Sequence, residues 1–192
     1  EASRQGDLES VKGILAGEKV GVDSTLDDSY TALAYAAAGG HLSLVKELLA
    51  HGADVNLQTR FSKSPLNHAV GGGSEEACEL LIGAGARLDL RNDNGSSLLH
   101  EAAYWGQADM IPFLVSKGQK VNDSGQRYGA TPLIYAISRA NSASSIEAAG
   151  KFINFAMTLL EHGADADLTN NAGKSARSIA AESKFDSVRD LF

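Results

Sequence analysis

The sequence has few cysteine, proline and aromatic residues and no long apolar run. A single cysteine, Cys78, stands among 192 residues, which excludes an intramolecular disulfide framework and a multi-cysteine zinc or iron–sulfur site. No apolar run approaches the roughly 18 residues that a membrane-spanning helix needs. Lysine and arginine number 17 against 24 aspartates and glutamates, so the chain, at a net charge of −7, lacks the positive surplus with which proteins bind nucleic acid or anionic membranes. We therefore expect a soluble, intracellular, cytoplasmic protein with no membrane insertion and no nucleic-acid partner.

Glycine is the residue that the chain has in excess. The 20 glycines stand against 3 prolines, and this ratio indicates many similar turns and hence internal repeats. A segment does recur with a period of about 33 residues, and its successive copies open at Thr31, Ser64, Ser97 and Thr131. A partial copy precedes them, and another begins at Ser175. The copies divide the chain into repeats at 1–23, 24–56, 57–89, 90–122, 123–167 and 168–192.

Each copy predicts a pair of helices that cannot be stable alone. The opening Ser or Thr can cap a helix because its hydroxyl oxygen accepts a backbone N–H, and Pro65 and Pro132 follow it in the first turn, where a missing N–H costs nothing. Small residues such as Ala36 and Ala37 allow this first helix to approach its neighbours closely. The second helix carries a bulky apolar stripe and is followed by a glycine suited to a left-handed cap, at Gly52, Gly85, Gly118 and Gly163. One pair leaves its apolar face uncovered, so the pairs must stack.

This repeat resembles that of the ankyrin repeat family, and the resemblance covers nearly the whole chain. Thr31–Leu33, Gly40–Leu42, Val45–Leu49 and Gly52–Asn56 match the family pattern almost residue for residue. The resemblance implies an all-α solenoid with β-hairpin fingers, formed by a single ankyrin repeat domain over residues 1–192.

The sequence departs from the family pattern in two ways. The helix-opening histidine of the family is kept only at His100, so we expect its hydrogen bond to be missing in most repeats, where the position holds Ala34, Asn67, Ile134 or Ser178. The fifth repeat also carries about 11 extra residues near 141–151, between its two helices. These residues either form a mobile loop or extend both helices. They are either a tolerated surface insertion or a binding element at the rim opposite the fingers.

The residues that could carry chemistry are accounted for by the repeat. Cys78 occupies an apolar position of a second helix and is expected in the core. His51 and His162 precede capping glycines, where an imidazole suits the C-terminal end of a helix, and His68 is expected to be a partly exposed helix residue. No two histidines have metal-binding spacing, and Gly71–Gly73 lacks the lysine and the preceding strand of a phosphate loop. We therefore expect no enzyme, no catalytic residue, no cofactor and no metal site.

The resemblance also predicts which residues contact a partner. In ankyrin repeats the finger tips and the exposed end of the first helix are free to vary, and they line a concave groove. Among the residues that these positions give, carried over residue by residue, the candidates for partner contact are Tyr30, Arg60, Phe61, Lys63, Asp93, Asn94, Tyr104, Trp105, Arg127, Tyr128 and Arg139. The other residues at these positions are Asp27, Asp28, Ala38, Gly71, Gly72, Ser96, Ser138, Asn171, Lys174 and Glu182. Five of the candidates are aromatic, and we expect their rings to face solvent, although Phe61 and Tyr104 could instead fold back onto neighbouring repeats. The cations among the candidates alternate with Asp27, Asp28 and Asp93, which suits a partner of mixed charge with an apolar anchor.

These features favour a monomeric, non-catalytic module that binds a partner protein or peptide through its concave groove, with Trp105 near the centre. Two alternatives stay open. The chain is a targeting module of a larger enzyme or of an exported, host-directed effector, or it is an inhibitor or immunity protein that blocks an enzyme, with the 141–151 insertion taking part.

Overall fold

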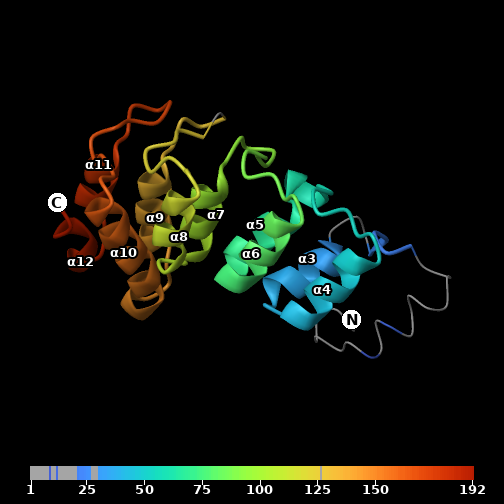
Figure 1. Ribbon diagram of the computed structural model, residues 1–192. Coiled ribbons are helices and arrows are strands. Elements are labelled where there is room, and N and C mark those ends of the chain that lie inside the picture. Colours follow the sequence, from blue (N-terminus) through green and yellow to red (C-terminus); the bar gives the residue numbers. More distant parts are fainter. Residues whose placement is uncertain (1–8, 10–11, 13–20, 27–29, 126) are drawn as a thin grey trace. The chain divides into compact units, whose positions relative to one another are not determined.

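The computed structural model describes residues 9, 12, 21–26, 30–125 and 127–192 (Figure 1). Most of the first expected repeat therefore lies outside the described residues, as do Asp27 and Asp28. The chain divides into two compact units, Glu1–Asn92 and Asp93–Phe192, which are described in turn as the N-terminal and the C-terminal unit.

In its described residues, the N-terminal unit has a small hairpin and two helix pairs. Its elements are β1 (Thr25–Leu26), β2 (Tyr30–Thr31), α3 (Ala32–Ala38), α4 (Leu42–Ala50), the 3₁₀ turn η1 (Arg60–Ser62), α5 (Pro65–Gly72) and α6 (Glu75–Gly83). The two strands pair antiparallel, with Thr25 opposite Thr31. Helix α3 packs against α5, and α4 packs against α6. The first helices of successive repeats therefore form one layer and the second helices another.

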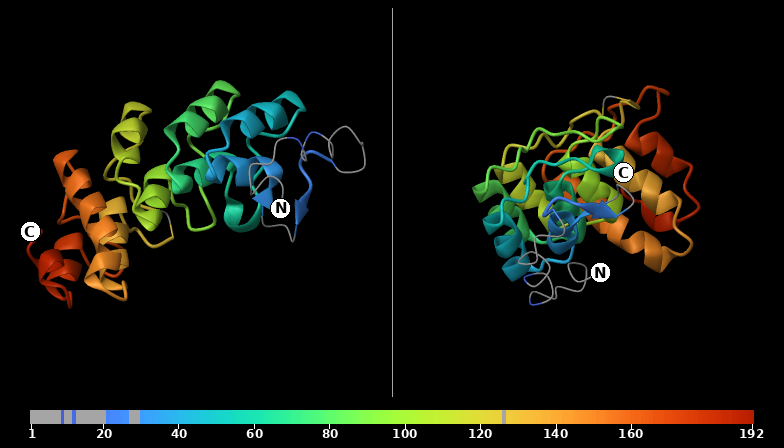
Figure 2. Two further views of the ribbon diagram at one scale, coloured as in Figure 1. Left: turned by 90° about the horizontal axis from the view of Figure 1, so that it is seen from below. Right: turned by 90° about the vertical axis from the view of Figure 1, so that its right-hand side faces the viewer.

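The C-terminal unit repeats this arrangement with three helix pairs. Its helices are α7 (Leu98–Trp105), α8 (Met110–Ser116), α9 (Pro132–Asn141), α10 (Ile146–Glu161), α11 (Ala176–Ala181) and α12 (Asp186–Arg189). Within this unit, the loops that join one pair to the next lie together at one end of the helices (Figures 1 and 2). Helix α10, with 16 residues, extends further than its neighbours at the other end (Figure 1). One of the loops forms a short antiparallel bridge between Thr169 and Ser175.

The first helices begin where the sequence predicts, and their caps are more complete than expected. The hydroxyl oxygens of Thr31 and Thr131 accept backbone N–H groups three residues on, at 3.1 and 3.3 Å. In three other helices, a side chain of the first turn accepts the N–H of the capping serine: Asn67 at 3.0 Å, His100 at 3.2 Å and Ser178 at 2.9 Å. The prediction that this bond is lost wherever histidine is replaced is therefore wrong at Asn67 and Ser178, because amide and hydroxyl oxygens reach the same N–H.

The predicted left-handed caps are confirmed. Gly52, Gly85, Gly118 and Gly163 follow the second helices with φ of +80°, +94°, +85° and +84°. At Gly52 and Gly163 the glycine turns the chain after a histidine, whose Nδ1 lies 2.9 or 2.8 Å from a carbonyl of the last turn. His51 and His162 therefore serve the helix ends, as predicted.

The core of each unit consists of leucines from both layers together with small residues between them. Leu33, Leu48, Leu66 and Leu81 are fully buried in the N-terminal unit. Phe155, on α10, is the largest fully buried side chain among the described residues, and α10 packs against α9. Because each apolar face is covered by the next pair, the stability of the fold comes from stacking rather than from any single pair.

Replacing Gly72 with alanine should destabilise the N-terminal unit. A Cβ atom at this position would lie 2.2 Å from the carbonyl oxygen of Ala38, so α5 and α3 would have to separate. We expect a loss of about 1–3 kcal/mol in the free energy of unfolding, measured by urea denaturation. Gly83, at the end of α6, is the matched control, because no atom lies within 4 Å of the Cβ that alanine would add. Alanine there should stabilise the helix by up to about 1 kcal/mol, and equal effects at the two glycines would contradict the close approach of the helices.

Candidate partner-binding surface

The predicted binding residues fall into two groups, one in each unit. Tyr30, Arg60, Phe61 and Lys63 belong to the N-terminal unit, and the C-terminal unit carries Asp93, Asn94, Tyr104, Trp105, Arg127, Tyr128 and Arg139. Four of the five aromatic side chains are exposed as predicted: Phe61 (58%), Tyr104 (40%), Trp105 (43%) and Tyr128 (50%).

Tyr30 is only partly exposed, unlike the other four rings, so its prediction as an exposed ring is wrong. The side chain is half-buried. Its ring stacks on Tyr35 of α3 with 4.6 Å between centroids, and it lies 4.4 Å from the ring of His68 of α5. The physical reason is that two neighbouring helices each supply a ring at this position, so Tyr30 is covered from within the protein.

His68 is buried rather than partly exposed, which corrects a second expectation. Only 8% of the residue is accessible, and Nε2 has no hydrogen-bond partner among the described residues. Burial, reinforced by the positive charge of Lys63, lowers the pKa of His68 from 6.5 to about 4. The imidazole is therefore neutral at physiological pH and packs as an aromatic ring against Tyr30.

Phe61 projects from a finger held in an unusual backbone conformation. Phe61 and Ser62 have φ of +63° and +53°, in the left-handed region that non-glycine residues rarely adopt. The turn is closed by the N–H of Thr59, which donates to the carbonyl of Lys63 at 3.1 Å. The side-chain amide of Gln58 reinforces it by donating to the carbonyl of Ser62 at 2.5 Å. Such strain persists only where surrounding bonds over-determine it, and it concentrates at functional sites.

The C-terminal unit holds an aromatic–arginine cluster, defined by Tyr104, Trp105, Arg139 and Phe152. The rings of Tyr104 and Trp105, at the end of α7, meet edge to face with 5.3 Å between centroids. The indole N–H of Trp105 donates to the carboxylate of Glu101 at 2.8 Å. The guanidinium carbon of Arg139, on α9, lies 4.5 Å from the Tyr104 ring and 5.1 Å from the Phe152 ring. Three helices thus hold the exposed rings in fixed positions.

Tyr128 is held in place differently, by backbone hydrogen bonds between successive finger loops. The backbone N–H of Arg127 donates to the carbonyl of Asn94 at 3.1 Å, and the N–H of Asn171 donates to the carbonyl of Tyr128 at 3.0 Å. The guanidinium of Arg127 lies over the Tyr128 ring, 5.4 Å from its centroid. Successive fingers of this unit are therefore joined, and the half-exposed ring is held on their surface. Asp93 is exposed in the same loop as Asn94.

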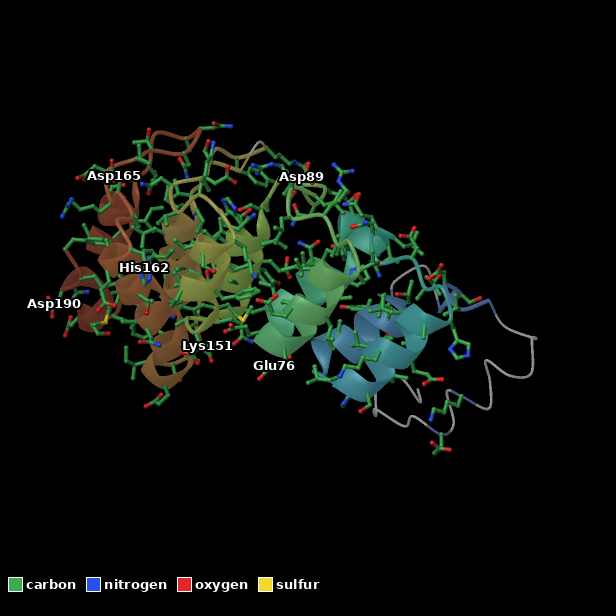
Figure 3. All side chains as sticks on the ribbon, viewed as in Figure 1. Glu76, Asp89, Lys151, His162, Asp165 and Asp190 are labelled. Atoms are coloured by element: carbon green, nitrogen blue, oxygen red, sulfur yellow. The ribbon has the colours of Figure 1, made fainter. Side chains whose placement is uncertain are left out.

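The insertion near 141–151 extends helices rather than forming a loop. Most of it forms the first turns of α10, and Ser145 caps them by accepting the N–H of Ala148 at 3.2 Å. These turns pack over Gly106, because a Cβ there would lie 3.0 Å from Cγ of Lys151 and 3.3 Å from Cδ1 of Phe152. Lys151 lies at the end of the unit opposite Asp165, which belongs to the loop after α10 (Figure 3). The insertion therefore reaches the residue next to Trp105.

Sequence reasoning missed three residues at this surface: the exposed Lys151, and Glu101 and Phe152, which are buried beneath the exposed rings. None of them stands at a position that varies for partner binding in the family pattern. The available signal was that Lys151 is the last residue of the insertion and that the aromatic residue Phe152 follows it directly.

The other candidates for chemistry have structural roles. Cys78 is fully buried, and burial together with Glu75 and Glu79 raises the pKa of its thiol to about 12. The thiol is therefore protonated at neutral pH and lies in the core, as predicted. Within the described ranges, no three His, Cys, Asp or Glu side chains gather in a way that could hold a metal ion. Likewise, no helix in the part of the chain that the structure describes is both long and apolar enough to cross a bilayer.

Stacked helix pairs joined by finger loops define a class of repeat proteins built for presenting a surface. The chain belongs to the ankyrin repeat family: the family model described as ankyrin repeats (3 copies) matches residues 1–92 and 66–149. Ankyrin repeats generally mediate protein–protein interaction, and the fold is generally a non-enzymatic module.

Two solved structures share the fold over nearly the whole chain. The crystal structure of the ankyrin repeat protein EF0377 has a TM-score of 0.75 and 26% identity, covering 99% of this chain and 93% of that one. An ankyrin repeat domain from Acinetobacter baumannii AYE has a TM-score of 0.73 and 25% identity, with the same coverage.

Curated relatives match over shorter segments. Palmitoyltransferase akr1 of Schizosaccharomyces pombe is 44% identical over 55 residues, which are 29% of this chain and 9% of that protein. Ankyrin repeat domain-containing protein 49 of Bos taurus is 41% identical over 58 residues, which are 30% of this chain and 24% of that protein. The chain thus aligns with less than a quarter of the length of either relative.

Proposed function

We propose that this chain is a non-catalytic module that binds a partner protein or peptide through its finger tips and the exposed ends of its first helices. In this family, these positions line the concave groove. The observation that carries the proposal is the pair of exposed rings at Tyr104 and Trp105, held in place by Glu101 and Arg139.

Exposed aromatic rings are unfavourable in water unless another molecule covers them. Each ring of this size buries about 150–250 Å² when it is covered. Trp, Tyr and Arg are also the residue types that dominate the energetics of protein interfaces. The aromatic–arginine cluster brings all three types together on one surface.

The cluster is also rigid before any partner arrives. The hydrogen bond to Glu101 fixes the indole of Trp105, and Arg139 lies against one face of the Tyr104 ring. Side chains that are already ordered lose little conformational entropy on binding. This supports rigid presentation of anchor residues rather than folding upon binding.

A targeting module of a larger enzyme is the second candidate. The observation that favours it is that the similar segment makes up only 9% of the palmitoyltransferase from S. pombe. Such a module would use the same surface. The two candidates differ in whether the full-length protein also contains an enzyme domain, and the sequence of the full reading frame distinguishes them.

Affinity capture from native lysate tests the proposed surface. The wild-type protein, a Tyr104→Ala/Trp105→Ala variant and a Met157→Ala control are immobilised side by side. Met157 is an exposed apolar side chain of α10 in the same unit, outside the family's variable positions. We expect proteins that the wild type and the control capture and the double variant loses. If the wild type and both variants capture the same proteins, the cluster is not the binding surface.

A further inference from the structure

Arg139 and Lys151 are the cations beside the exposed rings of Tyr104 and Trp105, and they differ from Arg177 and Lys174 of the same unit in their partners. Arg177 pairs with Asp167 at 2.8 Å, and Lys174 pairs with Glu182 at 2.8 Å. Arg139 and Lys151 have no carboxylate partner among the residues that the structure describes; their recorded contacts are with aromatic rings. Arg127 and Lys184 likewise contact rings, but only Arg139 and Lys151 lie beside the pair Tyr104 and Trp105, where no carboxylate of the described residues neutralises their charge.

Arg139 is oriented for a ligand by the rings that hold it. Its guanidinium carbon lies 4.5 Å from the centroid of the Tyr104 ring and 5.1 Å from that of the Phe152 ring. Its Nε is buried and has no hydrogen-bond partner in the described part of the chain. A buried donor left without an acceptor is unfavourable by about 1–3 kcal/mol. A guanidinium that lies against aromatic rings can still donate from its two terminal amino groups, and a carboxylate accepts two parallel hydrogen bonds from such a pair.

Lys151 adds a second positive charge from the insertion. Its ammonium nitrogen lies 5.0 Å from the centroid of the Phe152 ring, the same ring that Arg139 contacts. Both cations therefore lie beside one nearly buried ring, and the side chain of Lys151 passes over Gly106, next to Trp105. The first turns of α10 thus bring positive charge to the aromatic pair.

We infer that the aromatic–arginine cluster, with Lys151, binds an acidic segment of the partner protein in which an Asp or Glu stands next to a large apolar side chain. Arg139 donates hydrogen bonds to the carboxylate, Tyr104 and Trp105 cover the apolar side chain, and the charge of Lys151 adds to the attraction. The inference rests on the proposed function and assigns the insertion a binding role. Two cations beside apolar rings suit a single carboxylate better than a nucleic-acid backbone, which needs many phosphate contacts.

Selection from a library of random short peptides tests the inference. The library is displayed on phage and selected against immobilised wild-type protein, the Tyr104→Ala/Trp105→Ala variant and an Arg139→Gln variant. We expect wild-type selection to enrich Asp or Glu beside large apolar residues. The Arg139→Gln variant should lose the acidic preference and keep the apolar one, whereas the double variant should lose both.

The affinity of the best wild-type peptide, measured by fluorescence anisotropy, isolates the carboxylate contact. We expect Arg139→Gln, and separately Asp→Asn or Glu→Gln in the peptide, to weaken binding by about tenfold each, with no further loss when both are combined. Arg189→Gln, which removes a cation of the second helix α12 that is already paired with Asp186, is the matched control and should leave binding unchanged. Circular dichroism of each variant confirms that its helices are intact.

The possible outcomes distinguish a failure of this inference from a failure of the proposed partner-binding function. Peptides that need Tyr104 and Trp105 but show no acidic preference, or that bind Arg139→Gln equally well, overturn the acidic-segment inference alone. If no peptide depends on Tyr104 and Trp105, both the inference and the proposed binding surface are contradicted.

Discussion

Replacing Trp105 with alanine should weaken binding of the captured partner by at least about 2 kcal/mol, or roughly 30-fold in Kd. The side chain is 43% exposed, and its indole is already fixed by Glu101, so a partner gains apolar contact without ordering the ring. Alanine removes this contact and leaves the pocket on the partner unfilled. The measurement is calorimetric titration of wild type and variant at one salt concentration.

Two further variants show whether the lost affinity reflects the ring itself. Trp105→Phe keeps an aromatic surface but lacks the N–H that bonds Glu101, and it should retain part of the affinity. Met157→Ala removes an exposed apolar side chain elsewhere on the same unit and should bind as the wild type does. Thermal unfolding of each protein shows that the fold persists. An unchanged affinity for Trp105→Ala would remove it from the centre of the interface.

Acidification should destabilise the N-terminal unit through His68. The pKa of this buried imidazole is about 4 in the folded protein, whereas an unburied histidine side chain, as in the unfolded chain, has a pKa of 6.5. The unfolded chain therefore binds a proton more readily than the folded one as the pH falls below 6.5. The stabilisation from the neutral ring is fully present above pH 6.5 and is lost progressively toward pH 4. A shift of this size corresponds to roughly 3 kcal/mol of unfolding free energy.

A variant with no titrating ring separates His68 from the carboxylates that protonate near the same pH. His68→Phe keeps an aromatic side chain against Tyr30, whose ring lies 4.4 Å away. Urea denaturation at a series of pH values from 7 to 4 should show a smaller loss of stability in this variant than in the wild type. Parallel curves for the two proteins would mean that His68 titrates normally and is not buried.

The sequence predicted the local structure well because helix caps and turns involve residues close together in the chain. Thr31 and Thr131 cap their helices as expected, and Gly52 and Gly163 turn the chain in the left-handed conformation. Bonds between residues three or four apart depend on little beyond their own spacing. The prediction failed at Asn67, where the hydrogen bond of the family's histidine was expected to be missing. The amide oxygen of Asn67 accepts the N–H of the capping serine in place of a histidine nitrogen.

The binding surface was predicted less completely because exposure depends on distant residues. Tyr30 was expected in solvent but lies against Tyr35 and His68. Phe152 was not expected to contribute at all, yet it lies against Arg139 because the insertion extends α10 toward α7. The choice between loop and helix for the insertion was open in the sequence, since alanine and serine suit either.

The amino-acid sequence by itself determined the period of the repeat, the ends of its helices and its membership of a family of stacked helix pairs. These properties follow from residue spacing and from backbone preferences that act within a few residues. Only the tertiary structure decided which rings remain in contact with water and which cations lack a carboxylate. The physical reason is that burial and charge pairing are properties of neighbours in space, and residues about 33 apart in the chain become such neighbours only when the repeats stack.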